Sequence, residues 1–181
     1  QERSNRDLAR FLISRGLFLM VLEITVVRLV WYFTWSIDGM FLQVIWAIGF
    51  SMAVLGVLVF CGIPPQVIGL IGAAIVLGHN LLDPPPGASG PAFNGGPPPP
   101  AHPLFTLLLR PGRLPIVSGV TWFEGYPMLP WFGIMALGFA FGEVLTRPRP
   151  RRIRITALTG LVATLAFIGL RWLAVYGNPV P

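Results

Sequence analysis

Long apolar runs dominate this chain, and short polar or proline-rich connections separate them. A bilayer core of about 30 Å is crossed by roughly 20 mostly apolar helical residues. The pattern therefore predicts an all-α fold, a polytopic transmembrane helical bundle with about five spans, in which residues 1–181 form a single transmembrane domain. The expected spans cover residues 17–35, 41–61, 66–82, 128–146 and 155–176.

The connections between these runs differ in length and composition. Only Ser36–Met40 separates the first two spans, which predicts a tight antiparallel hairpin. Gly62–Pro65 interrupts the next connection, because proline has no backbone N–H to donate. Residues 83–127 are expected to form a long Pro/Gly-rich loop. Within this loop Leu104–Leu109 is apolar but too short to cross, so we expect it to lie on the membrane surface.

Composition agrees with a membrane protein. Hydrophobic residues make up 54% of the chain and charged residues 11%, whereas a soluble domain carries about 25% charged residues. A net charge of +6 could indicate a nucleic-acid partner, but the arginines flank apolar runs without an aromatic-basic motif, which predicts none. The single Cys61 excludes an intrachain disulfide, and one Cys with two distant His residues predicts no metal site.

The distribution of arginine predicts the orientation of the chain. Cytoplasmic loops of membrane proteins carry an excess of Lys and Arg. If the N-terminal end of this piece is cytoplasmic, alternation of the spans places residues 83–127 outside, where only Arg110 and Arg113 fall. The arginines then on the cytoplasmic side are Arg3, Arg6, Arg10, Arg15, Arg147, Arg149, Arg151, Arg152 and Arg154. We therefore expect a multi-pass protein of the cell membrane with this N-terminal end inside.

Two charged residues, Glu23 and Arg28, fall well inside the first expected span. Charged groups at membrane depth usually pair inside the bundle or line an aqueous path. At about 100° per residue, their separation places them about 140° apart on an α-helix, so they are poorly set to pair with each other. They indicate either a structural ion pair with another helix or a polar pocket or proton path.

The end of the third expected span carries a second set of candidates, His79, Asn80 and Asp83. A neutral His can accept a proton near neutral pH, and a carboxylate four residues further on lies on the same helical face. These residues are candidates for catalysis. The same residues could equally close a helix by satisfying its last carbonyls before Pro84.

Five segments carry a family resemblance, and they are Leu8–Leu17, Glu23–Val27, Leu42–Ala47, Gly78–Asp83 and Tyr126–Gly133. Together they resemble a family of bacterial integral membrane proteins. That family is related to the heparan-alpha-glucosaminide N-acetyltransferase catalytic domain, within the wider transmembrane acyltransferase group. This resemblance implies a location in the bacterial inner membrane and transfer of an acyl group from cytoplasmic acyl-CoA to an acceptor, such as a sugar, at or across the membrane. The resemblance implies acyl-CoA as donor and no covalently bound cofactor.

The resemblance also implies that this chain is an internal fragment. In the family the histidine associated with transfer lies near the first helices, upstream of anything that matches this chain, so the resemblance does not place that role on His79. The first residue, Gln1, is not Met, and the family has further helices on both sides. Two other functions stay open, a transporter or exporter in which Glu23 and Arg28 line a path, and a non-catalytic membrane module.

Overall fold

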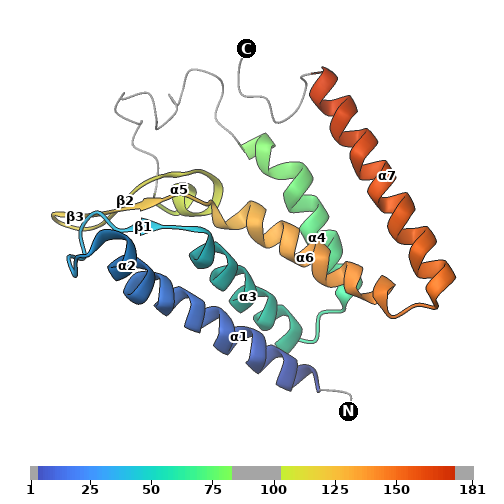
Figure 1. The fold of residues 1–181 in the computed structure, drawn as a ribbon, viewed down its shortest axis with the longest axis horizontal. Helices are drawn as coiled ribbons and strands as arrows, with labels where there is room; N and C mark the ends of the chain where they lie inside the picture. The colour runs from blue at the N-terminus through green and yellow to red at the C-terminus, as the bar shows by residue number, and fades with distance from the viewer. Residues whose placement is uncertain (1–3, 83–102, 174–181) are drawn as a thin grey trace.

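The computed structural model describes residues 4–82 and 103–173, and most of them are helical (Figure 1). The helical segments are α1 (Asn5–Leu22), the π-helical turn η1 (Glu23–Val27), α2 (Arg28–Tyr32), α3 (Val44–Phe60), α4 (Pro65–Gly78), the 3-10 turn η2 (His79–Leu82), α5 (Pro103–Leu109), α6 (Met128–Leu145) and α7 (Arg149–Leu173).

Three of the described helices are long and apolar enough to cross a membrane. They are α4 together with η2 (Pro65–Leu82), α6 and α7, and the apolar helix α3 is shorter. The prediction of a helical membrane protein agrees with this result, whereas the larger number of about five spans stays a prediction. The expected loop segment Leu104–Leu109 coincides with the short helix α5.

The first helix extends beyond the expected span at residues 17–35. It begins at Asn5, where the Ser4 side chain accepts a hydrogen bond from the Arg6 backbone N–H, and it continues through η1 and α2. It ends at Phe33, whose backbone is left-handed with a φ of 51°. Polar residues before an apolar run can belong to the same helix. The length of the apolar run therefore underestimates the length of this helix on its N-terminal side.

The prediction of an all-α chain was wrong in one respect, because a small three-stranded sheet caps one end of the bundle (Figure 1). Its strand order is β1-β3-β2, with β3 parallel to β1 and antiparallel to β2. The hairpin of β2 and β3 turns at Gly119, which has a φ of +81° and follows Ser118. The strands are β1 (Phe41–Leu42), β2 (Gly112–Val117) and β3 (Val120–Glu124).

The helices pack as two close pairs, α1 with α3 and α4 with α6. A Cβ added at Gly16 would collide with the carbonyl oxygen of Gly49 in α3, and one added at Gly72 would lie 2.7 Å from the carbonyl oxygen of Gly133 in α6. Glycine therefore lets these backbones touch, as small residues do in membrane helix pairs. The main hydrophobic core joins both pairs and contains Ala9, Leu55, Val59, Ile68, Phe132 and Ala136.

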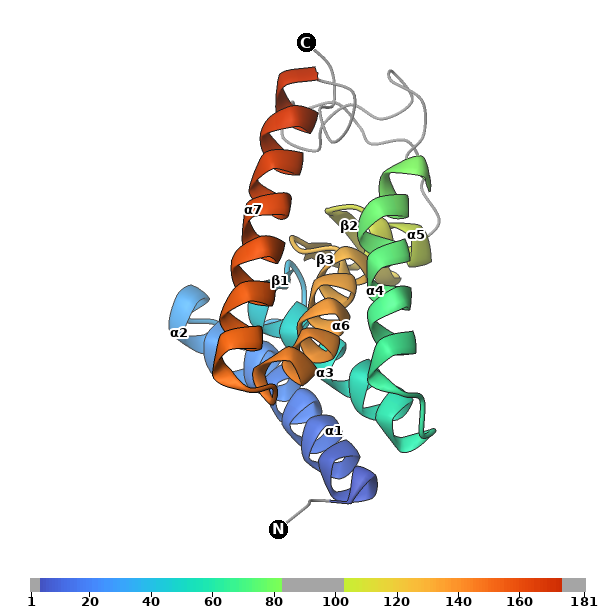
Figure 2. The ribbon, with the colours of Figure 1, turned by 90° about the vertical axis from the view of Figure 1, so that its right-hand side faces the viewer.

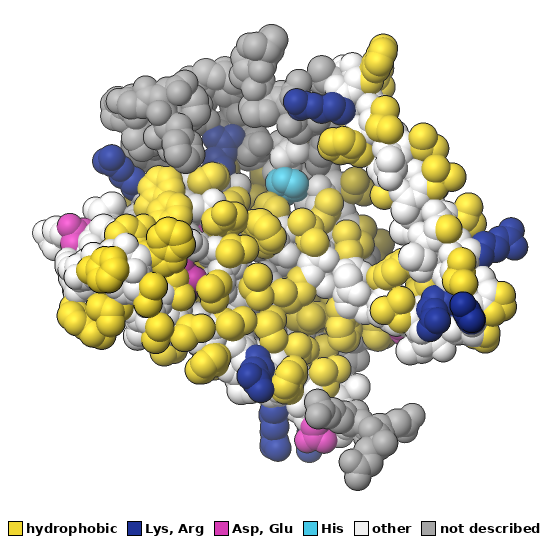
Figure 3. All heavy atoms as spheres, in the orientation of Figure 1, with side chains coloured by type: hydrophobic (Ala, Val, Ile, Leu, Met, Phe, Trp, Pro, Cys, Tyr) yellow, Lys and Arg dark blue, Asp and Glu magenta, His cyan; other side chains and the backbone are white. Residues whose placement is uncertain are grey.

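Helix α7 lies along one side of the molecule (Figure 2), and none of its residues is buried. Apolar side chains such as Phe167, at 67% exposed, cover its length. Apolar side chains also cover much of the face of the molecule in Figure 3, where the arginines lie mostly toward its margins. This surface suits lipid rather than water.

We expect Gly16→Ala to lower the free energy of unfolding by about 1–3 kcal/mol, because the added methyl group must push α1 away from α3. Gly138→Ala is the matched control, since a Cβ at Gly138 meets no described atom within 4 Å. Alanine is also the better helix former, by about 1 kcal/mol, so the control should be neutral or stabilising. Thermal unfolding of both variants in one detergent measures the difference, and equal melting temperatures would contradict the packing.

Candidate functional site

The π-helical turn η1 places Glu23 and Arg28 on one side of the first helix. The Arg28 backbone N–H donates to the carbonyl oxygen of Glu23, so one wide turn separates the two residues. Both side chains are buried, with 3% of Glu23 and 7% of Arg28 exposed. The expected separation of 140° assumed α-helical geometry, whereas residues 23–27 are π-helical. Single π turns inside α-helices often occur at functional sites.

The Glu23 carboxylate lies at the beginning of α3. Its Oε1 accepts a hydrogen bond of 3.2 Å from the Gln43 backbone N–H, whereas the side chain of Gln43, the residue that precedes α3, caps nothing. A negative charge is favourable at a helix N-terminus. Glu23 therefore caps α3 from a neighbouring helix. Its Oε2 is buried and has no hydrogen-bond partner among the described residues.

The Arg28 guanidinium binds the backbone of the same connecting segment. Its Nη2 donates to the carbonyl oxygen of Asp38 at 2.8 Å, and its Cζ lies 5.7 Å from the centre of the Tyr32 ring. Its Nε and Nη1 are buried without a partner in the described ranges. Among the hydrogen bonds of the described residues, Glu23 and Arg28 both use the 36–43 segment rather than each other.

A third buried charged residue, Glu124, was missing from the sequence prediction. It ends β3 with 0% of its side chain exposed, next to Leu42 of β1 in the parallel register. Its Oε1 accepts a 3.2 Å bond from the Tyr126 backbone N–H, and its Oε2 has no partner among the described residues. The alternating apolar and β-branched residues after Gly119 were the available signal, because they predict a strand that ends at this acid.

The pKa of Glu124 is raised from its ordinary value of 4.5 to about 8, mainly by burial. The Tyr126 N–H opposes this rise in pKa, and the nearby charge of Glu23 adds to it. The same end of the bundle holds two acids, each with one carboxyl oxygen bound to a backbone N–H and the other without a hydrogen-bond partner in residues 4–82 and 103–173. Glu124 is mostly protonated at neutral pH, which avoids two buried like charges.

Further bonds fix the 36–43 segment to β3. Asp38 Oδ1 accepts from the Thr121 backbone N–H at 2.8 Å, and the Trp122 Nε1–H donates to the carbonyl oxygen of Ile37 at 2.9 Å. The Thr121 N–H, followed by that of Gly39, lowers the pKa of Asp38. This connection is therefore a rigid support for the buried acids rather than a free hairpin loop.

The structure places His79 and Asn80 in η2, at the end of α4, where both are half-buried. His79 Nδ1 lies 3.1 Å from the carbonyl oxygen of Ile75 and 3.0 Å from that of Val76. Carbonyl oxygens only accept, so Nδ1 carries the proton and Nε2 of the neutral ring is an acceptor. His79 thus satisfies the last carbonyls of its own helix. Asp83 lies outside the described residues, so its pairing with His79 stays a prediction.

The described residues contain no group of three or more His, Cys, Asp or Glu side chains that could hold a metal ion. The groups of this region that could transfer a proton or form further hydrogen bonds include the Glu23 and Glu124 carboxyl groups and His79 Nε2.

We expect Glu124→Gln to remove a pH dependence of stability. The folded protein holds the Glu124 proton up to about pH 8, whereas the unfolded chain releases it near its ordinary pKa of 4.5, so stability falls as pH rises between these values. The melting temperature of the wild type should fall from about pH 5 to about pH 8.5, and that of Glu124→Gln should fall less. Glu143→Gln, which removes one charge elsewhere, should keep the wild-type slope. An unchanged slope in Glu124→Gln would contradict the assignment.

Glu23→Ala should lower the free energy of unfolding by about 1–3 kcal/mol, because it leaves the Gln43 N–H without its acceptor at the start of α3. Glu23→Gln retains an oxygen at the same position and should cost less. Chemical or thermal unfolding of the two variants in detergent compares them directly. Equal losses would show that the carboxylate charge, and not the hydrogen bond to Gln43, stabilises this region.

Comparison with known proteins gives one family. The family model described as "Heparan-alpha-glucosaminide N-acetyltransferase, catalytic" matches residues 2–178, which is nearly the whole chain. The comparison with curated proteins finds no match, and neither does the comparison with solved structures. The resemblance seen in the sequence is thus confirmed at the level of the family.

Proposed function

The chain belongs to the heparan-alpha-glucosaminide N-acetyltransferase catalytic family, and we propose from this membership that it takes part in acyl transfer at a membrane. The donor would be cytoplasmic acyl-CoA, and the acceptor an amine or hydroxyl group, as on a sugar. The match over residues 2–178 is the observation that carries this proposal. The apolar helices α4, α6 and α7 support a membrane setting.

The arrangement of charge supports the orientation expected from the sequence. The start of α1, with Arg6 and Arg10, and the α6–α7 turn, with Arg147 and Arg149, lie toward the same end of the molecule in both ribbon views (Figures 1 and 2). We place this end in the cytoplasm, where acyl-CoA would arrive. The sheet and η2 would then lie toward the outer face of the bacterial inner membrane, where the acceptor would bind.

His79 is the residue we assign to proton transfer on the acceptor side. Its Nδ1 is held by the carbonyls of Ile75 and Val76, which leaves Nε2 as a base of fixed orientation. The acyl thioester would have to reach this side of the membrane. As the acceptor nitrogen or oxygen attacks the acyl carbon, the acceptor's proton would pass to Nε2 and the bond between the acyl carbon and sulfur would break. The thiolate released would then take up this proton from Nε2 and leave as the thiol. Asn80, in the same turn, and Asp83 would border the acceptor pocket.

Glu23 and Arg28 support this site from a distance rather than lining a path. Each binds a backbone group of the 36–43 segment, and that segment is bonded in turn to β3. A transport path would need side chains that a passing solute can reach, whereas these are almost fully buried. We therefore favour transfer over export.

The test is acylation of a glucosamine acceptor by the full-length protein in proteoliposomes supplied with labelled acetyl-CoA. We expect His79→Ala to lower kcat by about 10²–10⁴-fold, as loss of a general base does, with a smaller effect on the KM for acetyl-CoA. His102→Ala, which removes the other histidine, should retain activity.

Two outcomes would contradict different parts of the proposal. An inactive wild type with glucosamine and with other amino-sugar or hydroxyl acceptors would contradict acyl transfer itself. Full activity in His79→Ala would remove His79 from the reaction and leave the transfer function standing.

A further inference from the structure

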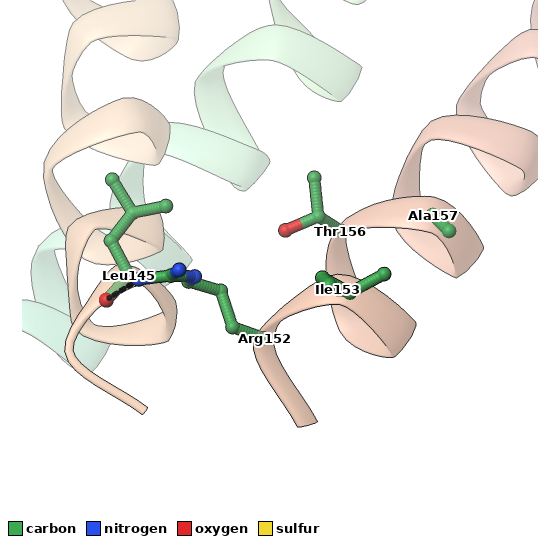
Figure 4. Close-up of a pocket in the computed structure, with 5 residues that line it drawn as sticks. All are labelled: Leu145, Arg152, Ile153, Thr156 and Ala157. Carbon is green, nitrogen blue, oxygen red and sulfur yellow. Dashed lines mark hydrogen bonds between the residues drawn. The ribbon is translucent and has the colours of Figure 1, made fainter. Parts of the chain in front are cut away.

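The end of α6 and the beginning of α7 enclose an open groove, which we call the α6–α7 groove (Figure 4). It has a volume of about 430 Å³. Its apolar lining faces outward from the bundle, because Leu145 and Ile153 are each 55% exposed. The residues that line it are Leu145, Arg152, Ile153, Thr156 and Ala157.

Strong positive charge borders this groove. Five arginines fall between residues 147 and 154, and Glu143 is the last acidic residue in the sequence. Both carboxylate oxygens of Glu143 lie 2.8 Å from Gln66 Nε2, so this acid is already engaged with α4. Arg152 reaches across the groove, and its Nη1 donates to the carbonyl oxygen of Leu145 at 3.3 Å (Figure 4).

The groove lies where a membrane surface would be. Helices α6 and α7 both have the length and composition of membrane spans, so the short turn between them falls at the boundary between hydrocarbon and headgroups. Residues of α7 beyond the groove are exposed and apolar, as lipid-facing residues are. Basic pockets between membrane helices on the cytoplasmic side are typical sites for anionic lipid headgroups.

We propose that the α6–α7 groove binds an anionic phospholipid. Its phosphate would contact Arg149 and Arg152, which are neighbours on one helix face, and an acyl chain would follow Leu145, Ile153 and Ala157. The lining contains no aromatic or amide side chain that could hold an adenine ring, which favours a phospholipid over acyl-CoA. This site is independent of the acyl-transfer proposal, because its argument uses only charge, shape and position.

Native mass spectrometry of the delipidated full chain in detergent, titrated with phosphatidylglycerol or phosphatidylcholine, tests the proposal. We expect tighter binding of phosphatidylglycerol. The double variant Arg149→Gln/Arg152→Gln should bind phosphatidylglycerol more weakly, by about five-fold for each charge removed. Arg6→Gln with Arg10→Gln removes the same charge from α1 and should leave this binding unchanged. Ala157→Trp, which fills the groove, should weaken binding, and Ala163→Trp, further along the exposed helix, should not.

Three results would each overturn the proposal. Equal affinity for phosphatidylglycerol and phosphatidylcholine would show that the groove does not recognise the negative charge of the lipid. Equal losses of phosphatidylglycerol affinity in the α7 and α1 double variants would show that the lipid is attracted to the positive charge of the whole protein and not to the groove. Displacement of phosphatidylglycerol by acetyl-CoA would assign the groove to the donor instead.

Discussion

A carboxylate or guanidinium that leaves water must find hydrogen-bond partners, and in this molecule Glu23 and Arg28 find theirs in the backbone of one connecting segment. The segment formed by residues 36–43 has backbone groups to satisfy at the end of a bundle, where neighbouring surfaces are apolar. Glu23 accepts from its last N–H, and Arg28 donates to one of its carbonyls. Each of these bonds joins a buried side-chain atom to a backbone group of the segment, whereas Glu23 Oε2 and Arg28 Nε and Nη1 have no hydrogen-bond partner among the described residues.

The π turn allows Glu23 and Arg28, which lie on the same helix, both to bind the 36–43 segment. In regular α-helical geometry the two residues would lie about 140° apart around the helix. The i→i+5 bond between Arg28 and Glu23 widens one turn and brings both to the buried side. The sheet is connected to this arrangement, because the segment that the helix holds contains β1. Strand β1 pairs with β3, and β3 ends at Glu124.

The sequence predicted the parts of the fold that depend on apolar length. Helices α4, α6 and α7 coincide with long apolar runs, because a helix in lipid must be apolar over its whole crossing. The sheet and Glu124 were not predicted. Strand pairing depends on residues far apart in the chain, and Phe41–Leu42 is too short to signal a strand alone. The π turn left no compositional trace, so an angle computed from ideal helix geometry was misleading.

The positions of glycine in the sequence do not by themselves show where helices pack closely. Glycine matters at Gly16 and Gly72 because another backbone lies against each of them, and those contacts depend on which helices are neighbours. By contrast, a Cβ at Gly138 would meet open space among the described residues. A small residue therefore indicates the capacity for close approach, and only the arrangement of helices decides whether that capacity is used.

The two ends of the bundle differ in charge for different physical reasons. At the sheet end, Glu23 and Glu124 are buried, and each has one carboxyl oxygen bound to a backbone N–H. At the α6–α7 turn, the arginines are mostly exposed, and their acidic neighbour Glu143 is held by Gln66. The acids at the sheet end therefore make their described hydrogen bonds inside the fold, whereas the exposed arginines are left to interact with their surroundings. In a membrane those surroundings are phosphate headgroups, so the exposed end is the one whose behaviour should depend on lipid composition and ionic strength.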